Sequence, residues 1–300
     1  MAKSKVIILK SSKITGEPNP ADVGHLIEML GEGLMVLASE QKPQIALNEF
    51  IPPAKRVGIK PNCLTGKMTS SSPTLCNAIA KLLSSSGIKE EDIVIWERSE
   101  RELKKAGYQI NYSGSGPKVI ANDSPGVGYG SDLAVYGKVG SLITRALTDM
   151  VDYHINYPVL KDHSLAGLSS GLKNFYGAVH NPNKYHDNNC DPYAADVYSL
   201  PVIKEKNRLT IMDCFKIQYN GGPAYNGSYA INSNMILISD DPVAIDVIAL
   251  QILEDTRRQY GLKDLKSVGR YPSYLKTAAD TSHKLGNFEI GLIEKVEITV

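Results

Sequence analysis

The sequence lacks an excess of charge of either sign. Its 33 Lys and Arg residues nearly cancel its 32 Asp and Glu residues over 300 positions. A chain so balanced has no overall basic field to attract nucleic acid or an anionic membrane surface. We therefore expect neither nucleic acid nor a membrane as a partner, while a local charged pocket is still allowed.

Long hydrophobic runs are also missing. No stretch approaches the roughly 18 uninterrupted apolar residues of a membrane-spanning helix. The N-terminal segment MAKSKVIILKSSKITGEPNP has a short apolar run without the cleavage site of a signal peptide. These absences predict a soluble, cytoplasmic protein.

Cysteine is scarce and dispersed, at Cys63, Cys76, Cys190 and Cys214. Neither the C-x-x-C pairs of zinc ribbons nor the dense cysteine run of a ferredoxin is present. This spacing argues against a disulfide framework. We also expect the protein to carry no bound iron–sulfur cluster.

What is present is an alternation of strand-like and helix-like segments. Continuously apolar runs predict buried strands at residues 5–10, 56–62, 92–97, 118–122, 152–160, 208–215, 234–239 and 295–300. Helical patterns fall at residues 21–40, 73–86, 141–150, 164–179, 192–205 and 242–253. The alternation predicts an α/β fold with a mainly parallel or mixed sheet flanked by helices. We expect a single domain over residues 1–300; two lobes divided near the Gly- and Ser-rich stretch 112–140 are the alternative.

Polar residues follow five of the predicted strands, where ligands of such folds gather. They are Lys60 to Asn62, Glu97 to Ser99, Lys161 to His163, Asp213, and Asp240 with Asp241. One polar strand end is commonplace, but five together predict a polar floor at one edge of the sheet.

The segment from Lys161 to Asp191 holds three of the six histidines. A helix over 164–179 would place Lys173 at the flank of an apolar face, with His163 before it and His180 after it. Imidazole is the usual acid or base near neutral pH, and a histidine at a strand end, a lysine at a helix flank and a histidine in a loop can converge on one site, so these three are candidate catalytic residues. His180, His186 and Cys190 are candidate ligands for a divalent metal, although a single loop histidine or an isolated cysteine more often has a structural role.

Lys60 and Asn62 form a second candidate site with the start of the helix at Pro73. Ser72 is placed to cap that helix, whose free N–H groups favour an anion. We expect this group to bind the substrate anion, and Lys60→Met to weaken binding while leaving thermal stability nearly unchanged. Alternatively, the residues only turn the chain and cap the helix.

These motifs together resemble the DUF362 family. The resemblance runs from about Arg56 to Leu253 and includes K-P-N, K-x-H-x(9)-K-N and D-P-V-A-x-D in that order. It implies an α/β domain largely without assigned chemistry, often associated with iron–sulfur proteins because some members carry a Cys-rich segment that is missing here. The positions that match the polar pattern are Lys60, Asn62, Ser72, His163, Lys173, Asn174, Asp213, Asp241 and Asp246.

The sequence thus favours an enzyme acting on a small anionic substrate, with a carboxylate the leading choice. His163, Lys173 and His180 would carry redox or proton-transfer chemistry, while Lys60, Asn62, Ser72, Asn174 and Asp213 would bind the substrate. The alternative is a non-catalytic metal- or ligand-binding protein that serves a redox or cofactor-assembly system. An electron-transfer partner and a homo-oligomer are both compatible with this sequence.

Overall fold

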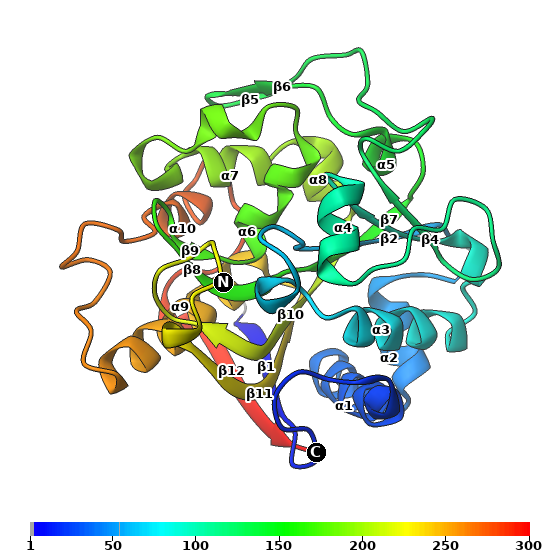
Figure 1. Cartoon of the computed structure of the whole chain (residues 1–300), viewed down its shortest axis with the longest axis horizontal. Helices are drawn as coiled ribbons and strands as arrows, with labels where there is room; N and C mark the ends of the chain where they lie inside the picture. The colour runs from blue at the N-terminus through cyan, green and yellow to red at the C-terminus, as the bar shows by residue number, and fades with distance from the viewer. Residues whose placement is uncertain (1–2, 54) are drawn as a thin grey trace.

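The computed structural model describes residues 3–53 and 55–300. Within them, ten strands form one mixed sheet, and a separate hairpin lies outside it (Figure 1). The sheet strands are β1 (Ser4–Lys10), β2 (Val57–Pro61), β3 (Ile93–Glu97), β4 (Lys118–Ala121), β7 (Tyr153–Tyr157), β8 (Val159–His163), β9 (Gly167–Ser169), β10 (Asn207–Gln218), β11 (Ala230–Ser239) and β12 (Ile293–Thr299). The hairpin pairs β5 (Ala134–Tyr136) with β6 (Val139–Ser141).

The strand order is β12-β1-β11-β10-β7-β2-β3-β4, with β8 continuing beside β10 and β9 folding back on β8. The strands from β10 to β4 run parallel, whereas β11 is antiparallel to both β10 and β1. This arrangement confirms the predicted mixed α/β sheet. The two-lobe alternative, divided near 112–140, stays a prediction.

Helices cover both faces of the sheet, since alternate residues of its buried strands point to opposite sides. In β1, Val6 and Ile8 enter one hydrophobic cluster, while Ile7 and Leu9 enter the other. The second cluster takes in α1 (Val23–Ala38), α2 (Pro43–Phe50) and α3 (Pro73–Ser85). The first takes in α5 (Arg145–Thr148), α6 (Gly171–Asn174), α7 (Tyr193–Tyr198), α8 (Pro201–Lys206), α9 (Pro242–Gln259) and α10 (Tyr274–Ala278) (Figure 1).

The predicted strands are all present, and three predicted helices appear as α1, α3 and α9. Two other predictions were too long. The 141–150 pattern yields only α5, and the 192–205 pattern divides into α7 and α8 at Pro201, which cannot continue the hydrogen bonding of the preceding helix. The helices α2, α4 (Glu100–Ala106) and α10 were not predicted.

The helix predicted over 164–179 was wrong, and its failure shapes the site. The chain turns back after His163, so that β9 pairs with β8 and only α6 and a following 3-10 turn are helical. Gly167 has φ +73°, and the carbonyl of Arg270 occupies the place where a side chain would stand. The apolar spacing matched a helix, but a positive φ and an available strand edge favour a hairpin here. His163 is therefore separated from Lys173 by a hairpin rather than by a helix.

Candidate functional site

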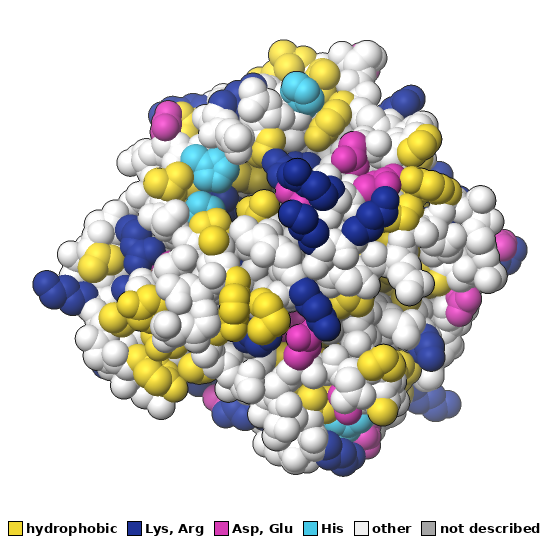
Figure 2. All heavy atoms as spheres, in the orientation of Figure 1, with side chains coloured by type: hydrophobic (Ala, Val, Ile, Leu, Met, Phe, Trp, Pro, Cys, Tyr) yellow, Lys and Arg dark blue, Asp and Glu magenta, His cyan; other side chains and the backbone are white. Residues whose placement is uncertain are grey.

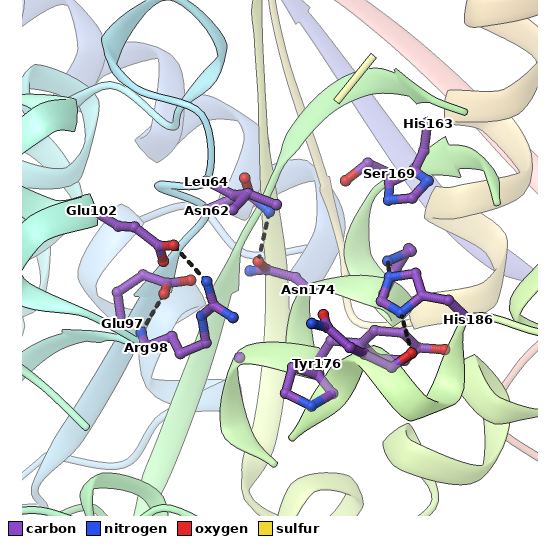
Figure 3. A pocket seen from close by; sticks show the side chains of 14 residues that line it. Asn62, Leu64, Glu97, Arg98, Glu102, His163, Ser169, Asn174, Tyr176 and His186 are labelled. Atoms are coloured by element: carbon purple, nitrogen blue, oxygen red, sulfur yellow. Dashed lines mark hydrogen bonds and ion pairs between the residues drawn. The ribbon is translucent and has the colours of Figure 1, made fainter. Parts of the chain in front are cut away.

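A cavity of about 250 Å³ opens at the carboxyl ends of β2, β3 and β8. Figure 2 shows Lys and Arg side chains gathered over the middle of this face, with His side chains beside them. Seen close by, His163, Ser169 and His186 lie on one side, and Glu97, Arg98 and Glu102 on the other (Figure 3). The lining also includes Asn62, Leu64, Lys173, Asn174, Tyr176, Gly177, Pro182 and Asn183.

His163 is held in one tautomer by its own turn. Its Nδ1 accepts hydrogen bonds from the backbone N–H groups of Leu165 and Ala166, each at 3.2 Å. The ring proton therefore sits on Nε2. Burial, together with the neighbouring Lys173 and His186, lowers the pKa of His163 to about 2. His163 is thus a neutral hydrogen-bond donor at physiological pH.

Lys173 contacts a second histidine instead of a carboxylate. Its Nζ lies 2.9 Å from Nε2 of His186, whose Nδ1 lies 3.3 Å from the carbonyl oxygen of Asn183. A carbonyl can only accept, so Nδ1 carries the proton and Nε2 accepts from Lys173. The rings of His163 and His186 stack at 5.7 Å. Burial lowers the pKa of Lys173 to about 8, which leaves a neutral amine fraction near pH 7.

Asp246 positions the short helix that carries Lys173. Its carboxylate accepts from the N–H groups of Gly171 and Leu172 at 2.8 and 2.9 Å. A side chain at Gly171 would stand 2.9 Å from that carboxylate, so the glycine keeps the approach open. Asp241 has a different role, because it caps its own helix α9 through Val243 and Ala244.

Glu97 and Glu102, which line one side of the cavity, are each paired with a cation of the protein. Lys60 is fully buried, and its Nζ lies 2.6 Å from Oε1 of Glu97. Arg98 pairs in turn with Glu102. The ammonium of Lys60 is thus neutralised within the protein, and Lys60 does not line the cavity. Its predicted role in substrate binding stays a prediction.

A chain of hydrogen bonds connects the floor of the cavity to a lysine that sequence reasoning had not selected. Lys161 donates to Oδ1 of Asn62 at 3.0 Å, to the carbonyl of Leu64 at 3.2 Å and to that of Thr69 at 2.8 Å. Asn62 Nδ2 in turn donates to Oδ1 of Asn174 at 3.3 Å. Burial lowers the pKa of Lys161 to about 7. The sequence did offer one indication of this role, because Lys161 lies two residues before His163 at the end of the same strand.

Ser72 and Asp213 lie elsewhere, on a cavity of about 20 Å³. The backbone N–H of Ser72 donates to Oδ2 of Asp213 at 2.8 Å, and the Ser72 side chain makes no capping bond. The carboxylate of Asp213 thus already occupies the start of α3. These two predicted substrate-binding residues are not brought together with Asn62 and Asn174.

Two further sequence candidates also lie outside the cavity lining. His180 is exposed, with its ring against Tyr129 at 5.1 Å, and Cys190 is fully buried in the core. No group of three or more His, Cys, Asp or Glu side chains suited to a metal ion occurs in residues 3–53 and 55–300. His180, His186 and Cys190 therefore do not assemble into such a group.

The thiols do not fit an iron–sulfur ligand set either. Cys63 and Cys76 are buried in one hydrophobic cluster, whereas Cys190 and Cys214 are buried in the other. Clusters of this kind need several thiolates around one centre.

Across the described part of the chain, no helix combines the length and apolarity that a membrane span requires.

The comparison with curated proteins found no match. Among solved structures, a crystal structure of a protein from Thermotoga maritima is similar, at 14% identity and a TM-score of 0.45. The similarity covers 82% of this chain and 60% of that one. The model of a domain of unknown function, DUF362, matches residues 57–251. That match includes every residue of the cavity wall described above, and the chain belongs to the DUF362 family.

Proposed function

We propose that this protein is an enzyme that binds a small carboxylate and transfers a proton at the carbon beside a carbonyl group. One observation carries the proposal: His163, Lys173 and His186 line a single cavity, and none of them pairs with a carboxylate in residues 3–53 and 55–300. Nitrogen donors without an internal anion are suited to an external one.

In this proposal His163 is a hydrogen-bond donor, and Lys173 and His186 together accept the proton. The Nε2–H of neutral His163 is available to donate to a carbonyl oxygen, and it would stabilise negative charge as that charge develops. Lys173 and His186 share one hydrogen bond and form the proton acceptor. An amine with a pKa of about 8 exchanges protons efficiently near neutral pH, because catalytic groups work best near the ambient pH.

Asn62 supplies a further donor. Its Oδ1 is occupied by Lys161, so its amide nitrogen faces the other way, with one N–H on Asn174. The second N–H is then available to a substrate carboxylate, since an amide nitrogen carries two donors. This arrangement supports a substrate with an anionic end and a polar, reacting end.

The test is solvent deuterium exchange. Wild-type protein is incubated in D₂O with a panel of small 2-oxo, 2-hydroxy and dicarboxylic acids, and NMR follows both binding and loss of the C–H signal. We expect exchange with at least one member, and roughly 100-fold slower exchange in His163→Gln and in Lys173→Met. His25→Gln, in α1 and away from the cavity, is the matched histidine control and should exchange normally.

The alternative function has its own outcome in the same experiment. Binding of a carboxylate without exchange by any panel member would support the non-catalytic ligand-binding protein. Failure of every carboxylate to bind, or equal exchange by wild type and both cavity variants, would overturn the proposal.

A further inference from the structure

Three lysines in the described residues expose less than a tenth of their surface, and each has a different environment. Lys60 is ion-paired with Glu97, and Lys161 directs its ammonium at three neutral oxygens. Lys173 alone among the three both lines the cavity and has an imidazole as its hydrogen-bond partner. Its amine is therefore the one placed to react with a small molecule.

The surroundings of this amine favour its neutral, nucleophilic form. Lys173 is buried, and the described residues offer its Nζ no ion pair; the face of the Tyr176 ring, 4.3 Å away, is a weaker partner for an ammonium than a carboxylate would be. An ammonium that is desolvated without a counter-ion loses its proton more readily, as the lowered pKa of Lys173 reflects. Nε2 of His186, at 2.9 Å, is in position to receive that proton.

We infer that Lys173 forms an imine with the carbonyl carbon of a 2-oxo acid. The inference rests on the proposed function and names its substrate class. The neutral amine attacks the carbonyl carbon, a C–N bond forms, and the carbonyl oxygen leaves as water with the two protons of the amine. No oxidant or reductant is consumed. Once protonated, the imine withdraws electrons from the neighbouring carbon, which makes its proton easier to remove.

The other cavity residues explain why the carbonyl compound is an acid. The second N–H of Asn62 and the Nε2–H of His163 are hydrogen-bond donors on the same cavity as Lys173. They can hold a carboxylate while the adjacent carbonyl meets the amine. The nitrogen of the protonated imine has no free electron pair and cannot accept a proton, so Nε2 of His186 becomes the acceptor for the substrate proton.

Borohydride trapping tests the inference. Wild-type protein is mixed with pyruvate or glyoxylate and reduced, then analysed by intact mass and peptide mapping. We expect one adduct per chain, equal in mass to the acid minus water plus two hydrogens, located on Lys173. Propionate, which lacks the 2-oxo group, should compete with labelling. Acetaldehyde, which lacks the carboxylate, should label Lys173 at least about tenfold more slowly. Lys184→Met, an exposed lysine variant, should label like wild type.

Adducts spread over surface lysines, or equal labelling of Lys173→Met, would overturn the inference. The peptide map of wild-type protein decides the matter even if Lys173→Met fails to fold. Deuterium exchange without trapping would leave the proposed function intact and remove the imine. Trapping of pyruvate at Lys173 without any exchange would keep the imine and remove proton transfer.

Discussion

At the scale of the residue, the partner of a buried lysine decides what that lysine can do. Lys60 and Lys173 are both buried, and both lie within the region of the DUF362 match. Glu97 neutralises Lys60, and this buried ion pair gives Lys60 a structural role. His186 leaves the charge of Lys173 uncompensated, and we propose that its amine is reactive for this reason. Sequence patterns select both residues but do not distinguish these environments.

Replacing Lys60 tests this distinction. Lys60→Met leaves Glu97 buried without its cation, so we now expect a loss of about 3–5 kcal/mol in the free energy of unfolding. The double variant Lys60→Met with Glu97→Gln should recover much of that loss, because no unpaired charge remains. Urea denaturation measures both. A single variant as stable as wild type would instead support the earlier expectation, in which Lys60 acts only as an anion ligand.

Lys161 offers a second prediction, on binding. Because Lys161 orients the Asn62 amide, Lys161→Met should weaken carboxylate binding about tenfold, the effect of one charge-assisted hydrogen bond. In an Asn62→Ala background the same change should have little effect. NMR titration of the four proteins of this cycle provides the measurement. Additive effects would show that Lys161 does not act through Asn62.

At the scale of the element, α6 is too short to be stable alone. It spans only Gly171 to Asn174, and a costly nucleus makes such a helix depend on outside contacts. The carboxylate of Asp246 supplies them from α9, far along the chain. The position of Lys173 therefore depends on a residue that never reaches the cavity lining.

Asp246→Asn should consequently affect both stability and the site. An amide can accept from one of the two N–H groups but presents its own donors to the other, so we expect a loss of about 2 kcal/mol in unfolding free energy. Borohydride trapping at Lys173 should fall as well. Asp255→Asn, on an exposed part of the same helix, should change stability by less than about 0.5 kcal/mol. Equal behaviour of the two variants would refute the capping role.

At the scale of the whole molecule, buried neutral histidines make the fold sensitive to acid. His154 is fully buried, with Nε2 accepting from the indole N–H of Trp96, and burial lowers its pKa to about 3. Burial also lowers the pKa of His163. The unfolded chain binds protons at these positions below about pH 6.5, whereas the folded chain does not. Stability contributed by both groups is therefore complete above that pH and is lost as the pH falls.

We expect each of these two histidines to reduce the free energy of unfolding by about 2 kcal/mol between pH 6.5 and pH 5. His283 acts in the opposite sense: burial disfavours its charge, but Asp196 and Asp280 together raise its pKa, so its contribution is present at low pH. Urea denaturation across pH 5–8 measures the sum. His154→Gln should lose about 2 kcal/mol less than wild type over that interval; identical pH profiles would contradict this account.

Much of the sheet could be predicted from the sequence. Uninterrupted apolar runs located the sheet strands because a buried strand excludes polar side chains from both faces. Polar groups after β2, β3 and β8 correctly pointed to one edge of the sheet. Asp240 did not join them, because β11 runs antiparallel and ends at the opposite edge. Strand direction depends on pairing, which the local pattern does not encode.

The sequence by itself determined the fold class, the family and a set of candidates that includes Asn62, His163, Lys173 and Asn174. Only the tertiary structure decided which of them share a cavity. It paired Lys60 with Glu97, placed Ser72 on Asp213, and left His180 at the surface. The physical reason is that burial and hydrophobic spacing act along the chain, whereas charge pairing and tautomer depend on neighbours brought from distant segments.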